Sequence, residues 1–403
     1  MLIYWIWFAQ LKKLSKGQKQ WLLEYFRDPE EIYHSEPKCY KGIPGMTQEI
    51  LQALEQKDLG EAKKILTQCE EKGIGILTFL DDAYPMKLRN TADAPMVLYY
   101  KGALPDWESL PVIGIVGTRK ATPYGMNTAL RFGRQIAACG AVVVSGGASG
   151  IDTMAMQGAM ETGKPVVGVL GCGVDVVYPK SNRQMFENVL QKGCLISEYP
   201  PGTQAYSWNF PERNRIISGM ANGLLVVEAP ERSGALNTAR HAMEQGRDVF
   251  AVPGNVDVAA CAGSNALLQE QALAALSGWD VAKQYEALYP GRIQKHSPPE
   301  PLPKVAQQPA IPQILRNSWT HNDKKSIDKE EKSTYSVLNV AKPLLSETEQ
   351  AVLSQITREE CCLDDIIDRT QLPAGTVKSA LTRLALKGLV VNHPGGRVSL
   401  KET

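Results

Sequence analysis

The 403-residue sequence has no long apolar run, no paired-cysteine motif and almost no excess of charge of either sign. Its N-terminus, MLIYWIWFAQLKK, is apolar and aromatic. That run is too short for a membrane span of about 20 residues, and it lacks the basic start of a signal peptide. We therefore expect a cytoplasmic protein with no membrane partner.

Cysteine usage and charge narrow the possibilities further. The eight cysteines are scattered, apart from the neighbours Cys361 and Cys362, and no C-x-x-C spacing occurs. This argues against a disulfide framework and predicts reduced, mostly buried thiols. Because the net charge is only +1, any nucleic-acid surface has to be local. The length predicts about two to three domains.

Familiar catalytic motifs are also missing. H-E-x-x-H and G-x-S-x-G do not occur, and the five histidines show no nucleophile or metal spacing. The sequence has no G-x-G-x-x-G fingerprint and no G-K-[ST], which argues against a standard dinucleotide or nucleoside triphosphate. The sequence therefore shows no evident catalytic machinery and predicts no cofactor or metal, and a nucleotide-cleaving carboxylate such as Glu228 stays open as an alternative.

What the sequence does contain is an alternation of apolar strands and helices over residues 111–287. The strand candidates are 112–116, 141–144, 165–170, 194–196, 224–227 and 248–252. This alternation predicts an α/β domain, a Rossmann-like, doubly wound parallel sheet with helices on both faces.

Two further regions precede this sheet. Residues 1–70 have aromatic and aliphatic residues at helical spacing and predict a small helical domain, SAM-like or helix-hairpin-helix-like. Within it, KGIPGMTQEIL (41–51) resembles a hairpin turn that presents N–H groups to a phosphate, and a plain helical turn is the alternative. Residues 71–110 predict a connecting segment that ends in a strand at 96–100.

The C-terminal part divides into a linker and a last domain. Residues 288–343 are rich in proline and charge and predict a disordered linker. Residues 344–403 predict a winged helix, with Ser346 and Glu349 forming a capping box at its first helix. Its third helix and wing offer the polar residues Thr376, Lys378, Thr382, Arg383, Lys387 and Arg397. However, residues 344–403 contain seven Lys/Arg and eight Asp/Glu, so their net charge is about −1. Because a duplex-binding domain is usually basic, a weak or partner-binding role is favoured over strong duplex binding.

Two glycine-rich loops follow the first two strands of the sheet. Gly117, Thr118 and Arg119 form the first, and SGGASGID, with Ser145, Gly146 and Gly147, forms the second. Both fall at the carboxyl edge of the sheet, where ligands bind, and loop N–H groups with an arginine suit a phosphate. The alternatives are a tight turn with Arg119 at the surface and, for Asp152, a helix cap.

Basic and aromatic residues recur along the same edge. Lys180 and Arg183 lie near Phe186, a combination that suits single-stranded nucleic acid, although Phe186 on spacing alone is more often a core residue. Arg213 and Arg215 open a later helix and either bind anions or pair with Glu198 and Glu228.

Taken together, several motifs resemble the DNA-processing protein A (DprA/Smf) family. They are GTRKATPYG, SGGASGIDTMA, GCGVDVVYPKSN, ISEYPPGT, FPERNRIISG, VVEA, SGALNTA, GRDVFAVPG and GSNALL. The resemblance implies a cytosolic DNA-binding protein rather than an enzyme. It implies a homodimer that binds single-stranded DNA, protects it and loads the recombinase RecA during natural transformation.

By position, the family's phosphate loop matches Gly117, Thr118 and Arg119, its basic residue after the YP-x-x-N motif matches Arg183, and its base-contacting aromatic matches Phe186. We expect the DNA site to comprise Gly117, Thr118, Arg119, Ser145, Gly146, Gly147, Lys180, Asn182, Arg183, Phe186, Arg213 and Arg215. The chain departs from the family at Asn237 and in GSNALLQEQAL, which bears on the dimer surface rather than on the DNA pocket.

Two enzyme classes are the rivals. Phosphoribohydrolases of the lonely-guy type share a related sheet and use Glu and Arg, so Glu228 becomes a candidate carboxylate. Their P-G-G-x-G-T-x-x-E signature is absent, and the matching turn reads APERSGALNTA. A nicotinamide-dependent oxidoreductase needs the dinucleotide fingerprint that the sequence lacks.

Overall fold

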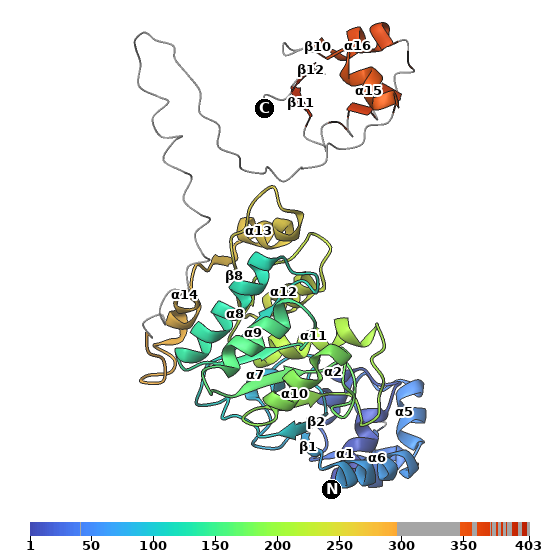
Figure 1. Ribbon diagram of the computed structural model, residues 1–403. Helices are drawn as coiled ribbons and strands as arrows, with labels where there is room; N and C mark the ends of the chain where they lie inside the picture. Colours follow the sequence, from blue (N-terminus) through green and yellow to red (C-terminus); the bar gives the residue numbers. More distant parts are fainter. Residues whose placement is uncertain are drawn as a thin grey trace, which may run out of the picture. The chain divides into compact units, whose positions relative to one another are not determined.

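The computed structural model describes residues 1–40 and 42–295 and parts of the C-terminal region (Figure 1). Those parts are residues 347–356, 361–370, 372, 376–377, 380–381, 384, 389–393 and 397–400. The chain forms two compact units, residues 1–307 and 308–403. The predicted linker, apart from residues 288–295, lies outside the described residues.

A nine-stranded sheet forms the centre of the first unit, in the order β1-β2-β6-β5-β4-β3-β7-β8-β9. The strands are β1 Gly75–Thr78, β2 Val97–Gly102, β3 Val112–Val116, β4 Val142–Ser145, β5 Val166–Val169, β6 Cys194–Ser197, β7 Gly223–Val226, β8 Asp248–Ala251 and β9 Leu273–Ala274. Neighbours from β6 through β9 are parallel. Because β4 and β7 flank β3, the sheet grows in one direction to β6 and then in the other, which confirms the predicted doubly wound fold.

The six predicted strands agree with β3 to β8 within one residue at each end. Residues 71–110 differ, because they do more than connect. They add β2, which pairs antiparallel with β6, and β1, which pairs antiparallel with β2. The short helix α7 (Met86–Arg89) lies between them. The strand predicted at 96–100 is β2. β1 was not predicted, because a strand added antiparallel at an edge carries no strand–helix alternation.

Helices cover both faces of the sheet, and alternate strand residues face each side. Ile113 and Ile115 join the core beneath α8 and α9, whereas Val112 and Val116 join the core beneath α11 and α12. The helices of this part are α8 Pro123–Ala138, α9 Ile151–Met160, α10 Arg183–Val189, α11 Asn209–Met220, α12 Gly234–Glu244, α13 Ala262–Gln269 and α14 Gly278–Ala282. Short 3₁₀ turns span Lys180–Asn182, Ala259–Cys261 and Lys283–Tyr285.

The N-terminal part is helical, as predicted, and packs against the β1–β2 end of the sheet through α1 and α6. Its helices are α1 Leu2–Gln10, α2 Lys16–Leu22, α3 Pro29–His34, α4 Pro37–Tyr40, α5 Gln48–Glu55 and α6 Gly60–Lys72. A turn with Gly45 at φ +79° joins α4 and α5, and Thr47 caps α5. This is the turn whose sequence resembles that of a helix-hairpin-helix.

The second unit contains α15 (Glu347–Leu353), α16 (Leu363–Thr370) and a three-stranded antiparallel sheet. The strands are β10 Cys361–Cys362, β11 Val390–His393 and β12 Arg397–Leu400, in the order β10-β12-β11. The predicted hairpin is β11–β12, and β10 is a strand that the sequence did not reveal. Ser346, Lys378, Thr382, Arg383 and Lys387 lie outside the described residues. Across the described ranges, no helix is long and apolar enough to cross a membrane.

Candidate nucleic-acid interface

A pocket of about 560 Å³ opens at the carboxyl edge of the sheet. It lies beyond the ends of the neighbouring strands β3 and β7, between the loops that follow them. Its walls are the loop after β3, the start of α9, the loop that leads into α11, and the loop between β7 and α12. This is the point where the direction of sheet growth reverses, and it is the usual ligand position in open α/β sheets. The pocket therefore lies where the sequence predicts a binding site.

The first loop is held in place by the chain on both sides of it. The backbone N–H of Thr118 donates to the carbonyl of Glu228 at 2.7 Å, and the N–H of Ile151 donates to the carbonyl of Thr118 at 3.3 Å. A Cβ at Gly117 would lie 2.5 Å from the Ile151 side chain. Glycine is needed here because the two loops approach too closely for any side chain. Arg119 and Lys120 extend from this loop and are exposed.

The second loop differs from the prediction. Its N–H groups at Gly146 and Ala148 donate to the Asp152 carboxylate, at 3.1 Å and 3.4 Å. Asp152 is therefore not the helix cap that the sequence offers as an alternative, because α9 begins after Gly150 without a side-chain cap and Asp152 lies in its first turn. It occupies part of the N–H nest that the sequence assigned to a phosphate. Ser145 is also engaged, because its buried hydroxyl donates to the carbonyl of Ile115 at 2.6 Å.

Arg213 compensates for the buried Asp152 charge. The Arg213 side chain is 3% exposed, and its Nη1 donates to the carbonyls of Gly146, at 2.7 Å, and Val169. Burial lowers the pKa of Arg213 to about 10, although Asp152 opposes that shift. Burial raises the pKa of Asp152, and Arg213 opposes that shift in turn. Arg213 is thus a fixed cation in the pocket wall, still protonated at neutral pH.

Phe210 is an aromatic pocket residue that the sequence did not predict, and the pocket cations Lys120 and Arg232 were not predicted either. The Arg119 guanidinium carbon lies 4.9 Å from the Phe210 ring centroid, and the Tyr178 ring lies 5.3 Å from it, centroid to centroid. A guanidinium over an aromatic face is attractive, so Phe210 orients the exposed Arg119. The motif FPERN contained the residue, but nothing in its spacing separates a pocket aromatic from a core one.

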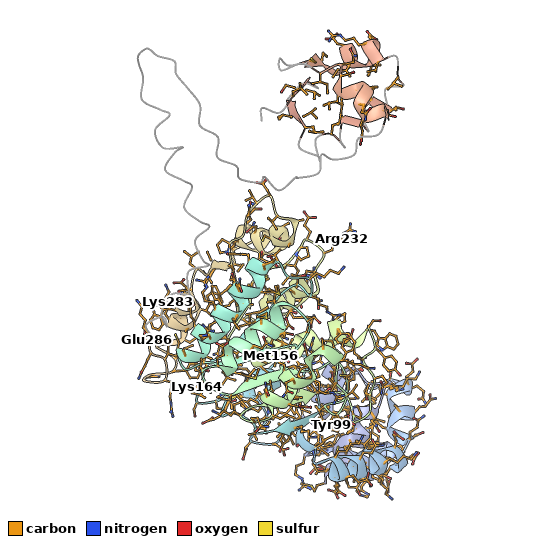
Figure 2. All side chains as sticks on the ribbon, in the orientation of Figure 1. Tyr99, Met156, Lys164, Arg232, Lys283 and Glu286 are labelled. Atoms are coloured by element: carbon orange, nitrogen blue, oxygen red, sulfur yellow. The ribbon has the colours of Figure 1, made fainter. Side chains whose placement is uncertain are left out.

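Lys180 and Arg183 are exposed beside the pocket and do not line it. Asn182, between them, is buried, and its side-chain amide donates to the carbonyl of Gly147 at 3.0 Å and to the hydroxyl of Thr153 at 2.7 Å. Asn182 therefore ties the Lys180–Arg183 turn to the second glycine loop. Arg232, labelled in Figure 2, adds an exposed cation from the loop after β7.

Phe186 lies in the core. Its side chain is 3% exposed, and a Cβ at Gly147 would lie 2.7 Å from its ring. Stacking on a base needs an exposed ring face. In this structure the ring instead packs beneath the second glycine loop.

Arg215 and Glu228 are both structural. Arg215 is 2% exposed and pairs with Glu198 at 2.5 Å and with Asp93 at 3.4 Å, so of the two alternatives for this residue the structure shows the ion pair. Glu228 is 1% exposed and accepts hydrogen bonds from the backbone N–H and the hydroxyl of Thr122, at 2.8 Å and 2.7 Å. Its carboxylate does not line the pocket. This placement does not favour Glu228 as a nucleotide-cleaving group.

Comparison with protein families agrees with this geometry. Residues 75–286 match the family described as DNA recombination-mediator protein A, and residues 339–396 match the DprA winged helix domain. The chain belongs to the DNA recombination-mediator protein A family. The family match begins at β1 and includes the pocket, and the resemblance drawn from the motifs is confirmed.

One relative in this family covers nearly the whole chain, and others cover half of it or more. A protein Smf from Synechocystis is 31% identical over 98% of this chain and 97% of its own length. The DNA processing protein DprA of Streptococcus pneumoniae is 41% identical over 52% of this chain and 73% of its own. A solved structure of S. pneumoniae DprA superposes with a TM-score of 0.62 and 34% identity, over 70% of this chain and 98% of that one.

Proposed function

We propose that this protein binds single-stranded DNA at the β3–β7 pocket as part of a DNA-processing role. The observation that carries the proposal is the pocket itself, which exposed Arg119, Lys120 and Arg232 line together with the half-buried ring of Phe210. Cations that meet phosphates and rings that meet bases are how proteins bind single strands without reading their sequence. The phosphates are held mainly by side chains, because Asp152 already occupies N–H groups of the second loop.

Lys180 and Arg183 extend the path of the strand beyond the pocket. Both are exposed on the turn that Asn182 holds against the second glycine loop. We propose that they contact phosphates that lie beyond the nucleotide in the pocket. Phe186 supports that loop from within the core rather than stacking on a base.

The family resemblance suggests the further steps. We propose that the protein acts as a homodimer, protects the bound strand and loads RecA onto it in transformation or homologous recombination. Two linked pockets would raise avidity without any new contact. The winged helix takes a weak or partner-binding role, because its region has nearly balanced charge.

The test is a fluorescence-anisotropy titration of the full chain with labelled single-stranded and duplex oligonucleotides at two salt concentrations. We expect a preference for single strands that weakens with salt, with a log–log slope of about −0.7 for each phosphate contacted. No binding to either oligonucleotide, together with release of a free base from a nucleoside monophosphate, would support the phosphoribohydrolase rival instead.

Two further assays address the finer steps. Displacement of a single-strand-binding protein by RecA on the same oligonucleotide, with and without this protein, tests loading. Removal of residues 344–403, which belong to a separate compact unit, tests the winged helix, and a large loss of duplex affinity would contradict the role proposed for it.

A further inference from the structure

The segment that leads into α11 carries two exposed aromatic rings outside the pocket. Tyr206 and Trp208 stack with their centroids 4.8 Å apart and their planes 5° from parallel. Trp208 is 66% exposed and Tyr206 is 46% exposed. The other tryptophans among the described residues are buried or half-buried. A large, flat apolar surface left in water calls for a partner.

The same segment also builds the pocket. Ala205 and Ser207 line the pocket wall, and Tyr206 and Trp208 alternate with them in the sequence. Phe210, which carries the Arg119 contact, follows two residues after Trp208. Because successive Cα atoms are about 3.8 Å apart, Trp208 and Phe210 lie within about 8 Å of each other along the backbone. Each ring of the exposed pair therefore belongs to a residue next in sequence to one that lines the pocket.

The backbone of this segment is anchored. The N–H of Asn209 donates to the carbonyl of Tyr206 at 3.0 Å, and the side-chain amide of Asn209 donates to the carbonyl of Gly171 at 3.0 Å. The hydroxyl of Tyr199 donates to the carbonyl of Asn209 at 3.3 Å. These bonds hold the start of α11 against the sheet, so the two rings stand on a fixed base and lose little freedom when a ligand binds.

Resting on the function proposed above, we propose that Tyr206 and Trp208 form a stacking platform for unpaired bases of the strand as it leaves the pocket. The cations at Arg119, Lys120 and Arg232 provide phosphate anchors in the pocket that the same segment lines, which favours single-stranded nucleic acid over an apolar protein partner. Bases of a duplex are stacked on one another and leave no face for the rings. The platform therefore adds single-strand preference rather than charge.

The test compares Trp208→Ala and Tyr206→Ala with Trp208→Phe in the full chain, by anisotropy on a single-stranded oligonucleotide. Alanine at position 208 should weaken binding roughly 5- to 100-fold, whereas phenylalanine should remain within about threefold of the wild type, because any aromatic face can stack. Tyr25→Ala is the matched control, since Tyr25 is a 50% exposed tyrosine of the N-terminal helical part.

Two further readouts separate stacking from other roles. The salt slope should stay the same in Trp208→Ala, since no phosphate contact is lost. An oligonucleotide with abasic sites should bind the wild type and Trp208→Ala equally. If Trp208→Ala does not fold, the wild type and Trp208→Phe still test the platform. Abasic sites should weaken the binding of both proteins, and DNA should quench a tryptophan signal that the wild type has and Trp208→Phe lacks.

The platform would be ruled out by unchanged affinity in a folded Trp208→Ala, by an equal abasic penalty in that variant and the wild type, or by a change of oligomeric state that accounts for the loss. If the wild type itself does not bind single-stranded DNA, then the proposed function fails and the platform fails with it. If the wild type binds single-stranded DNA and the Tyr206 and Trp208 variants bind it with the same affinity, the proposed function stands and the platform alone is wrong.

Discussion

The Arg119 guanidinium lies 4.9 Å from the centre of the Phe210 ring, and that of Arg213 lies 6.0 Å from the same ring. One cation is exposed and the other is fixed in the wall by backbone carbonyls. Phe210 therefore contacts both the exposed and the buried cation of the pocket. An exposed arginine that is already oriented loses less entropy when it binds a phosphate.

Replacing Arg119 with alanine should weaken single-strand binding at least about tenfold and reduce the salt slope by about 0.7. The reason is the loss of one oriented phosphate contact. Lys164→Ala is the control, because Lys164 is exposed just before β5, at the opposite edge of the sheet (Figure 2). Anisotropy titrations over several salt concentrations give both quantities. A folded Arg119→Ala protein with unchanged affinity would show that the strand binds elsewhere.

Gly150→Ala should destabilise the folded protein by about 2 kcal/mol or more. Gly150 has φ +82°, and a Cβ there would lie 2.5 Å from the carbonyl oxygen of Thr118, which is backbone and cannot rotate away. Gly234→Ala is the control, since a Cβ at Gly234 meets nothing within 4 Å at the first position of α12. Urea unfolding should place the control within about 1 kcal/mol of the wild type. Equal stabilities for the two variants would contradict the close approach of the loops.

Phe186→Leu should leave single-strand affinity nearly unchanged. The ring is buried beneath Gly147, so leucine keeps most of the apolar volume at a modest cost in stability. The family resemblance makes the opposite prediction, because a stacking ring replaced by leucine should cost about tenfold in affinity. Parallel urea unfolding and anisotropy on this one variant distinguish a supporting residue from a base-contacting one.

Lys19 should make stability rise with pH in the alkaline range. Burial lowers its pKa to about 8, opposed by Glu198 and reinforced by Lys16, and its Nζ donates to the carbonyl of Ala9 at 2.6 Å. Between about pH 8 and the ordinary lysine value near 10.5, the folded state binds fewer protons than the unfolded state. At lower pH, the buried charge of Lys19 reduces the free energy of unfolding. That reduction disappears as the pH rises through this window and Lys19 loses its proton in the folded state.

The measurement for Lys19 is the free energy of unfolding of the wild type minus that of Lys19→Met, followed between about pH 7 and pH 10. The difference should grow by on the order of 2 kcal/mol, since one pKa unit is worth about 1.4 kcal/mol. Both proteins share their tyrosines and cysteines, so the other groups that titrate in this range cancel. A difference that does not depend on pH would mean that Lys19 keeps its ordinary pKa.

The sheet was predictable because its strands are short, apolar and separated by helices. β3 to β8 alternate with helices and carry runs such as VIGIV and VVVS, which only a doubly buried parallel strand explains. β1 lacks that context and was not predicted, since it joins the sheet by antiparallel pairing at its edge. The position of the pocket could be predicted because loops that follow parallel strands share the carboxyl edge of the sheet. The order of the strands is known only from the structure.

The roles of individual site residues were harder to predict. Arg119 could be placed correctly because a loop after a central strand must lie at the carboxyl edge. The role of Asp152 could not be predicted. Its carboxylate accepts loop N–H groups that could otherwise bind a phosphate, and this arrangement depends on the position of Arg213 in the folded chain. Phe186 and Phe210 are both aromatics near helix starts, and only three-dimensional packing makes one a core residue and the other a pocket residue.

The antiparallel pairing of β2 with β6 bears on how the protein can be cut into pieces. β6 is apolar, and its outer side is closed only by residues 99–102. A minimal fragment beginning near residue 111, where the strand–helix alternation starts, would bare a row of backbone donors and acceptors that recruits a second chain. Gene fragments made for crystallisation or screening should therefore begin before Gly75. A protease cut between β2 and β3 should be tolerated only while the severed piece stays paired.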